Sequence, residues 1–145
     1  MLSRNSYDQQ YIDDTRAKIE SQVAAFKKVV TAATELPDEC EVKLDAAMQA
    51  FESVFFNNMV LVLDNYFAQR SRTIEKKDGN PLNEVRVLVS SLTNNEGLLI
   101  FDKSIKLDPA KSVLHYQTGD EIKVNEKSFA RLAAAFFTEI EKRFL

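Results

Sequence analysis

FFNNMVLVLDNYF, residues Phe55 to Phe67, is the most apolar stretch of the chain and decides how the chain folds. If the stretch is helical, its apolar side chains point to nearly every side, as in a helix that is surrounded by other helices. It therefore predicts a central helix, which we extend to about residues 38–73. Apolar residues before and within the stretch recur on one side of this helix: Leu44, Met48, Phe51, Phe55, Met59, Val62 and Tyr66.

The start of the central helix is marked by Leu36-Pro37-Asp38-Glu39. Proline suits the first position of a helix and carboxylates suit its first turn, so this tetrapeptide predicts a break followed by a new helix. A helix of this length is either continuous or divided in two by a kink near Ala50.

A second amphipathic helix is predicted ahead of this break, over about residues 6–34. Its apolar residues follow one another at spacings of seven, four, three, four and three: Ile12, Ile19, Val23, Phe26, Val30 and Ala33. A narrow stripe close to heptad periodicity is typical of a helix that packs along its length against another helix. The partner is either a helix of the same chain or a helix of a second copy.

Four polar residues interrupt the apolar stretch of the central helix: Asn57, Asn58, Asp64 and Asn65. Residues seven positions apart lie within about 20° of each other on a helix, so these four share a broad face with Arg72. The face is either the solvated edge of a buried helix or a polar cleft. In a cleft, Asp64 or Asn65 pairs with a nearby arginine. The available arginines are Arg70, Arg72 and Arg86.

KDGNPLNEVR, residues Lys77 to Arg86, combines a turn with the start of another helix. Asp78-Gly79 is a strong turn signal, because glycine adopts positive φ easily and aspartate bonds to nearby backbone. Asn80-Pro81 then supplies an N-cap and a first helical residue. The helix is predicted over about residues 81–95, and Gly97 supplies the left-handed residue that ends it.

Capping does not explain every polar residue of this region, because Asn83 and Arg86 have no part in it. An antiparallel arrangement of the two helices around the turn brings the residues before the turn close to those after it. With the polar face of the central helix, this defines a candidate polar or anion-binding cleft: Asp64, Asn65, Arg70, Arg72, Glu75, Asn83 and Arg86. The cluster is either a structural ion-pair network or an anion pocket.

The chain changes character after Gly97. Short apolar or β-branched runs, LLIF, SIKL, SVLHY and EIKV, alternate with turn chemistry such as Asp108-Pro109. The pattern predicts a β region over about residues 98–124. Its predicted strands are a hairpin of Val113–Tyr116 with Glu121–Val124, with or without Ile105–Leu107 as a third strand. An isolated hairpin is marginal in water, so this region must lie against the helices.

A final helix is predicted over about residues 126–144, with Asn125 as its N-cap. Its apolar residues recur at three- and four-residue spacing and close the core: Phe129, Leu132, Phe136, Ile140 and Phe144. The predicted fold is therefore mainly α, a bundle of about four helices in a single domain over residues 1–145. The β region is a small insertion before the last helix.

Three segments together resemble a group of short bacterial proteins to which no function is attached. The segments are KDGNPLNEVR, KSVLHYQTGDEIKV and SFARLAAAFFTEIEKRF, so the resemblance covers roughly Asn57 to Phe144. It implies a bacterial, cytoplasmic origin. It carries no reaction, ligand or catalytic residue to any position of this chain.

The charge balance bears on partners and location. Acidic residues outnumber basic ones by 22 to 19, whereas nucleic-acid binding relies on basic surfaces, so a nucleic-acid partner is not expected. The amino terminus has no apolar leader core, and no window of eighteen residues is apolar and uncharged throughout, so no membrane partner is expected. The single Cys40 cannot form an internal disulfide, which fits a cytoplasmic location.

The residue types for several common chemistries are missing. One histidine and one cysteine exclude zinc sites of the Cys₂His₂ or His₃ type and di-iron sites, and no pair of acidic motifs specifies a magnesium site. His115 lies in a predicted strand and is interpreted as a packed or edge residue. Glycine-rich phosphate loops and the nucleophile elbow are absent too, so neither a metal nor a cofactor is expected.

These exclusions favour a non-catalytic cytoplasmic helical protein with an interaction or regulatory role. It is expected to associate with its own copy, or with a protein partner, through its helices. Ten phenylalanines suit either a thick core or an oligomer interface.

The alternative is an enzyme that uses a polar cleft around Arg70, Arg72 and Arg86, such as a small helical ribonuclease resembling the HEPN proteins. Those proteins carry an arginine four to six residues before a histidine. Residues 109–111, which precede His115, include no arginine, so that signature is absent.

Overall fold

The computed structural model describes residues 2–35 and 41–145, and for residues 41–43 the backbone only. Four long helices and one short helix make up this part of the chain: α1 (Gln9–Thr34), α2 (Glu41–Tyr66), α3 (Arg72–Glu75), α4 (Pro81–Asn94) and α5 (Glu126–Phe144). The prediction of a mainly helical fold is confirmed.

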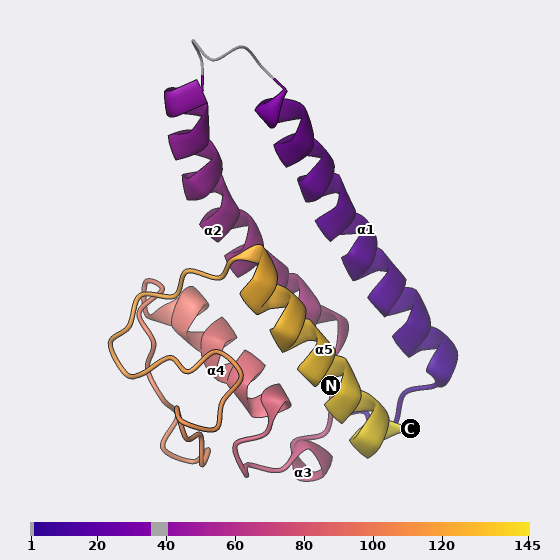
Figure 1. The fold of residues 1–145 in the computed structure, drawn as a ribbon. Coiled ribbons are helices and arrows are strands. Elements are labelled where there is room, and N and C mark those ends of the chain that lie inside the picture. Colours follow the sequence, from indigo (N-terminus) through magenta and orange to yellow (C-terminus); the bar gives the residue numbers. More distant parts are fainter. Residues whose placement is uncertain (1, 36–40) are drawn as a thin grey trace.

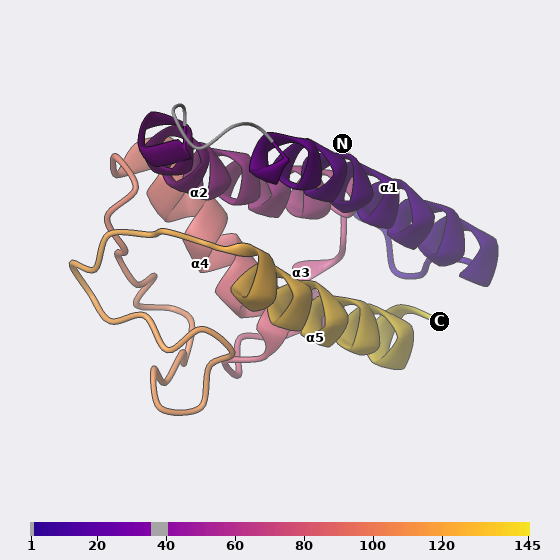
Figure 2. The same cartoon turned by 45° about the horizontal axis from the view of Figure 1, so that its top comes forward.

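The long helices form two layers. Antiparallel α1 and α2 make one layer, and α4 and α5 make a second layer that packs on one side of it (Figure 1, Figure 2). The last turns of α1 and the first turns of α2 extend beyond α4 and α5 (Figure 1). At the other end of the bundle the N-terminal segment is bound to the end of α5, since the amide of Tyr7 donates to the carbonyl of Phe144 at 2.7 Å.

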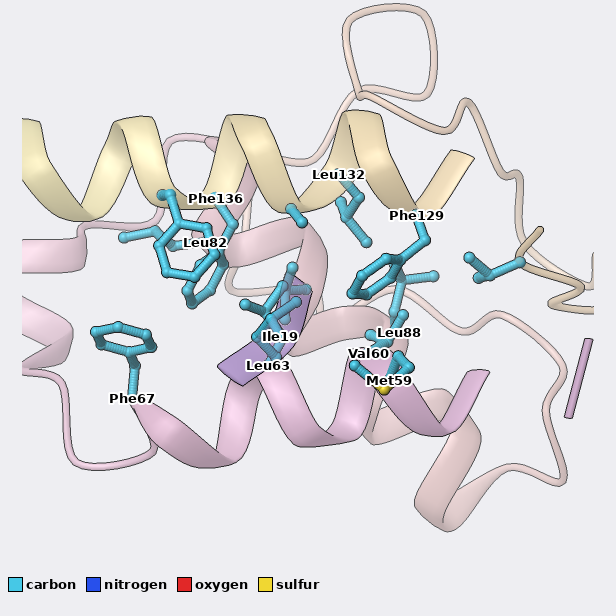
Figure 3. Packing of buried hydrophobic residues seen from close by; sticks show 14 of the residues in the cluster. Ile19, Met59, Val60, Leu63, Phe67, Leu82, Leu88, Phe129, Leu132 and Phe136 are labelled. Atoms are coloured by element: carbon cyan, nitrogen blue, oxygen red, sulfur yellow. The ribbon is translucent and has the colours of Figure 1, made fainter. Parts of the chain in front are cut away.

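The core lies between the layers, and α2 is its central element. Figure 3 shows Leu63 of α2 and Phe67, which directly follows α2, facing Phe136 of α5 and Leu82 of α4, while Ile19 enters from α1. Helix α2 contacts α1, α4 and α5, which accounts for its apolar residues on nearly every side. The apolar stripe of α1 thus packs against helices of the same chain, α2 and α5.

Side-chain caps set the helix starts. Asp8 accepts from the amide of Tyr11 at 2.7 Å, so α1 begins at Gln9, three residues later than predicted. The predicted caps Asn80 and Asn125 are confirmed: Asn80 accepts the amides of Leu82 and Asn83, and Asn125 accepts the amide of Ser128, with which it forms a capping box. These contacts are local in sequence, which is why the pattern of residue types reveals them.

The predicted central helix ends earlier than expected, at Tyr66 and not near Thr73. The N-terminal segment pairs with the chain just beyond α2: the amide of Arg4 donates to Gln69 at 2.6 Å, and that of Ser71 donates to the Arg4 carbonyl at 2.7 Å. These bonds hold the backbone away from helical geometry, and Ser71 caps the separate helix α3. From Glu41 onward α2 is one helix without a break near Ala50, and the predicted start at residues 38–40 lies outside the described residues.

The predicted β insertion is wrong. In the described segment between α4 and α5 there is no strand, and the only β contact is an isolated bridge between Leu98 and Glu121. Neither the hairpin of Val113–Tyr116 with Glu121–Val124 nor a third strand at Ile105–Leu107 forms.

Side chains of the helices replace the expected strand ladder. The carboxylate of Glu84 accepts from the amides of Val113 and Leu114, and the Asn57 side-chain oxygen accepts from the amide of Val124. Backbone groups bound in this way cannot pair with a neighbouring strand. Local β propensity was therefore overridden by helices that are distant in sequence.

Candidate functional site

Five of the seven predicted site residues meet at the end of the bundle where α3 joins α4. We call this group the Glu75 cluster: Asp64, Arg70, Glu75, Asn83 and Arg86. Glu75 and the side chains of Arg70 and Asn83 are buried, whereas Asp64 and Arg86 are partly exposed. The cluster joins the ends of α2 and α3 to the first turns of α4.

The Glu75 carboxylate is the centre of the cluster, and both of its oxygens accept hydrogen bonds. Arg86 binds it with two nitrogens, Nη2 to Oε1 at 2.9 Å and Nε to Oε2 at 3.0 Å. Nε of Arg70 donates to Oε1, and Nδ2 of Asn83 donates to Oε2 at 2.9 Å. This two-pronged guanidinium geometry is the strongest that an arginine and a carboxylate form.

Arg70 is directed entirely inward. Its Nη1 donates to Asp64 Oδ1 at 2.8 Å and to the carbonyl of Phe67 at 3.1 Å, and its Nη2 donates to the carbonyl of Leu82 at 3.2 Å. Its side chain is 0% exposed. Arg70 therefore has no surface to offer to a ligand or a substrate.

The charges of the cluster compensate one another. Burial by itself raises the pKa of the Glu75 carboxyl, but the hydrogen bond from Arg86 and the charges of Arg70 and Arg86 outweigh it and hold the pKa below its usual value. Two guanidiniums face two carboxylates, those of Glu75 and Asp64. The geometry is that of a structural ion-pair network and not of an open anion pocket.

The turn in KDGNPLNEVR is built around the side chain of Asn83. Its Oδ1 accepts the amide of Gly79 at 2.9 Å, and its Nδ2 also donates to the carbonyl of Lys76 at 2.9 Å. Gly79 has φ of +88°, and a Cβ there would lie 2.3 Å from the carbonyl oxygen of Lys106. Asn83 thus stabilises the turn through its hydrogen bonds, and Gly79 provides the backbone conformation and the space that the turn requires.

Arg143 is a contributor that the sequence did not suggest. It comes from the last turn of α5, and its Nη1 donates to the carbonyl of Glu75 at 3.2 Å, while its Nη2 contacts Asp78 at 3.4 Å. It lies 68 positions from Glu75 in the chain. No spacing rule within one helix or turn connects residues so far apart.

The polar face predicted on α2 is divided between the interior and the surface. Asp64 belongs to the Glu75 cluster, and Asn57 binds the Ile122 carbonyl at 2.9 Å and the Val124 amide at 3.0 Å. Asn58 and Asn65 are exposed. Asn65 is therefore outside the cluster in which it was predicted.

Arg72 is the other predicted residue outside the cluster, and it lines a cleft together with Arg86. The cleft lies beside α4, has a volume of about 310 Å³, and we call it the α4 cleft. Its lining residues are Arg72, Arg86, Val87, Ser90, Ile100, Phe101, Asp102 and Ile105.

A second depression, of about 380 Å³, lies between α1 and α5 and is lined mainly by apolar residues. Ion pairs between the two helices lie near its two ends, Arg16 with Glu141 and Lys27 with Glu126. The cations of its rim are thus paired with carboxylates across the groove, and they join α1 to α5.

Metal ligands do not gather in the described part of the chain, where no group of three or more His, Cys, Asp or Glu side chains is placed to hold an ion. Cys40 lies outside the described residues. His115 is exposed in the long segment and not in a strand, with φ of +60° and its Nδ1 2.8 Å from the carbonyl of Pro109.

Glu84 is a second buried carboxylate and anchors the long segment between α4 and α5. Its two oxygens accept the amides of Val113 at 2.7 Å and Leu114 at 2.9 Å. Burial raises the pKa of the Glu84 carboxyl, and the two amides and the charge of His115 only partly offset this effect. One side chain of α4 thereby helps to hold a segment that forms neither a helix nor a strand in the described residues.

Replacing Glu84 by alanine leaves two part-buried amides without an acceptor and is expected to lower the free energy of unfolding by about 2–4 kcal/mol. In this variant, hydrogen exchange is expected to accelerate at the amides of Val113 and Leu114 more than at amides inside α4. Urea denaturation and exchange measured by NMR check both effects. Glu96→Ala, an exposed site, is the control; unchanged exchange at the two amides in Glu84→Ala would disprove the anchor.

Comparison of the chain with protein-family models, with curated proteins and with solved structures finds no match in any of the three.

Proposed function

We propose that this chain is a non-catalytic helical interaction protein that associates with a second copy of itself through the outer side of the α1–α2 layer. The part of that side towards the end of α1 and the start of α2, which we call the hairpin face, consists of exposed residues: Ala25, Val29, Ala32, Ala47, Ala50, Phe51, Val54 and Asn58. The observation that carries the proposal is the exposure of its large apolar side chains, 53% for Val29, 44% for Phe51 and 59% for Val54.

The hairpin face points away from the second layer. Phe56 packs on Phe129 of α5, and Val54, two positions earlier, lies on nearly the opposite side of α2. In the same way Lys27 pairs with Glu126 of α5, and Val29 lies on nearly the opposite side of α1. Figure 2 shows α4 and α5 together on the other side of the α1–α2 layer.

The composition of the hairpin face is that of an interface centre. None of these eight residues is charged, although 28% of all residues in the chain are charged, and the exposed Lys28 lies only at the edge of the face. Solvated helix faces are normally rich in charge, whereas the centres of interfaces are depleted of it. Because Lys28 stands only at the edge, the centre of the face also meets its own copy without repulsion between like charges, as a two-fold symmetric dimer requires.

The outer side of the layer is large enough for such a dimer. Helices α1 and α2 have 26 residues each, so the layer is about 39 Å long and about 20 Å wide, or roughly 800 Å². A standard protein interface covers about 800 Å² of each partner. Pairing two layers of this kind produces a further four-helix arrangement from two copies.

A lipid bilayer is the competing occupant of this surface. Leu44–Tyr66 of α2 is long and apolar enough to cross a membrane by length and composition, and only 22% of the window concerned is buried. However, Lys28 is exposed at the edge of the hairpin face, three positions after Ala25 and one before Val29. Taking its ammonium group into hydrocarbon is unfavourable, so the geometry favours a second copy.

Sedimentation equilibrium of the purified chain tests the proposal. We expect a mass that rises with concentration towards twice 16.5 kDa. Val54→Glu buries an unpaired carboxylate at the interface and is expected to raise the dissociation constant about 100-fold. Gln49→Glu adds the same charge to another side of α2 and is expected to leave the dissociation constant unchanged.

Three results would overturn self-association through the hairpin face. One is a wild-type chain that stays monomeric at high concentration. Another is a Val54→Glu variant that keeps the wild-type dissociation constant. The third is a monomer that floats with phosphatidylcholine vesicles and loses this property in Val54→Glu, which would assign the face to a membrane.

The ribonuclease alternative finds no support in the geometry. Arg70, one of the three arginines that an active-site cleft would use, is buried and bound to Glu75 and Asp64. Cleavage of RNA by the purified protein, lost in a folded Arg72→Ala variant, would contradict the non-catalytic proposal. A bacterial, cytoplasmic origin stays a prediction from the sequence.

A further inference from the structure

Two arginines that line the α4 cleft have guanidinium nitrogens that the Glu75 cluster does not bind. Arg72 is exposed at the first position of α3, and Arg86 is 20% exposed on the second turn of α4. Asp102 also lines the cleft, and the charge of Arg86 is already balanced by Glu75, so the charges that remain at the cleft are those of Arg72 and Asp102. The cleft differs from the Glu75 cluster because the guanidinium of Arg72 forms no ion pair within the described residues.

The guanidinium of Arg86 is held in position before any ligand arrives. Its Nε and Nη2 are bound to Glu75, and Glu75 is in turn held by Arg70 and Asn83. Among the described residues, Nη1 of Arg86 has no acceptor. A donor whose side chain is already immobilised binds an acceptor with a smaller loss of conformational entropy.

Arg72 supplies a second set of donors at the same cleft. Within the described part of the chain its guanidinium has no hydrogen-bond acceptor. The Oδ1 of Asp102 accepts the hydroxyl and the amide of Ser104 at 2.7 and 2.8 Å, and within the described residues Asp102 forms no ion pair with Arg72. These hydrogen bonds, with the charges of Lys77 and Arg72, hold the pKa of Asp102 below its usual value.

The rest of the cleft is mostly apolar. Val87, Ile100, Phe101 and Ile105 line it, and Ile100 is 50% exposed. The hydroxyl of Ser90, one helical turn after Arg86, adds a polar group on the same side of α4. A volume of about 310 Å³ is at the small end of the range for ligand pockets.

We propose that the α4 cleft binds a small organic anion. Its anionic group, a phosphate or carboxylate, lies between Arg72 and Nη1 of Arg86, and its apolar group lies against Ile100 and Phe101. Guanidinium groups suit such anions because their planar donors match two oxygens at once. The apolar wall distinguishes this ligand from an inorganic ion.

Calorimetric titration with phenyl phosphate and with inorganic phosphate tests the inference on the full chain. We expect saturable binding, with phenyl phosphate about tenfold tighter because its ring removes apolar surface of the cleft from water. Arg72→Ala is expected to weaken both ligands about tenfold by removing a charge-assisted contact. Arg131→Ala removes an exposed arginine of α5 and is expected to have no effect.

Ile100→Ala tests the apolar part separately. It is expected to weaken phenyl phosphate and to leave inorganic phosphate unchanged. Absence of saturable binding to the wild-type chain, or equal binding by Arg72→Ala and the wild type, would refute the anion site. Equal affinity for the two ligands would refute an organic ligand. Circular dichroism confirms that each variant is folded, and sedimentation of Val54→Glu reports on self-association independently.

Discussion

Replacing Glu75 by glutamine lowers the free energy of unfolding by about 3–5 kcal/mol, the loss typical of breaking a buried ion pair from one side. Arg70, whose side chain is 0% exposed, then keeps only the partial compensation of Asp64. The amide nitrogen of glutamine would also face donors of Arg70, Arg86 or Asn83, where the carboxylate now accepts. Urea denaturation at pH 7, followed by circular dichroism, measures the loss.

Glu96→Gln is the matched control for this variant. Glu96 is exposed beyond the end of α4, so the same chemical change there is expected to alter stability by less than about 0.5 kcal/mol. If Glu75→Gln lost no more than Glu96→Gln, the Glu75 cluster would not be a source of stability.

The same variant is expected to change how stability depends on pH. The pKa of Glu75 is lower in the folded chain than its ordinary value of 4.5, so its contribution is complete above 4.5 and is lost as the pH falls through the folded pKa. Glu84, whose pKa is raised, acts in the opposite direction. We therefore expect the difference in stability between wild type and Glu75→Gln to shrink between pH 5 and pH 2, at the acid end of a series of urea midpoints.

Replacing Phe67 by alanine is expected to lower the free energy of unfolding by about 3–5 kcal/mol, because it removes a fully buried ring and leaves a cavity. Phe67 joins three parts of the chain. Its ring centroid lies 4.9 Å from that of Tyr7 in the N-terminal segment and 5.6 Å from that of Phe136 in α5. Alanine loses both contacts in addition to the burial of the ring.

Thermal and urea denaturation of Phe67→Ala provide the test, with Leu98→Ala as the control. Leu98 is 44% exposed, so the control is expected to stay within about 0.5 kcal/mol of the wild type. A loss below about 1.5 kcal/mol for Phe67→Ala would show that the core at this end of the bundle repacks around the missing ring.

The sequence predicts most of the helices, because their signals are local. The N-caps Asn80 and Asn125 stand within three residues of the amides that they bind. The β insertion was wrong because Glu84 and Asn57, 29 and 67 positions away, bind the amides of Val113 and Val124. A strand-like pattern reports side-chain preference and not where the backbone groups find partners.

The candidate site was predicted in part, because the sequence relates only those of its residues that lie close together along the chain. Arg70, Glu75 and Arg86 were expected to approach one another across the turn, and they do. The seven-residue spacing that relates Arg72 to Asn65 requires a helix that continues to Thr73. Because α2 ends at Tyr66, the seven-residue spacing no longer relates Arg72 to Asn65, and both side chains lie at the surface.

The amino-acid sequence by itself thus determines the helices α1, α4 and α5, the caps and the turn around Gly79, since each depends on hydrogen bonds and side-chain spacing within a few residues. Only the tertiary structure decides that Glu75 is shared by Arg70 and Arg86 and that Arg143 reaches it from α5. It also decides that Val29 and Val54 are left at the surface, because packing against α4 and α5 covers just one side of the α1–α2 layer. Burial and ion pairing depend on contacts between distant segments, and these are not encoded in any local pattern of residues.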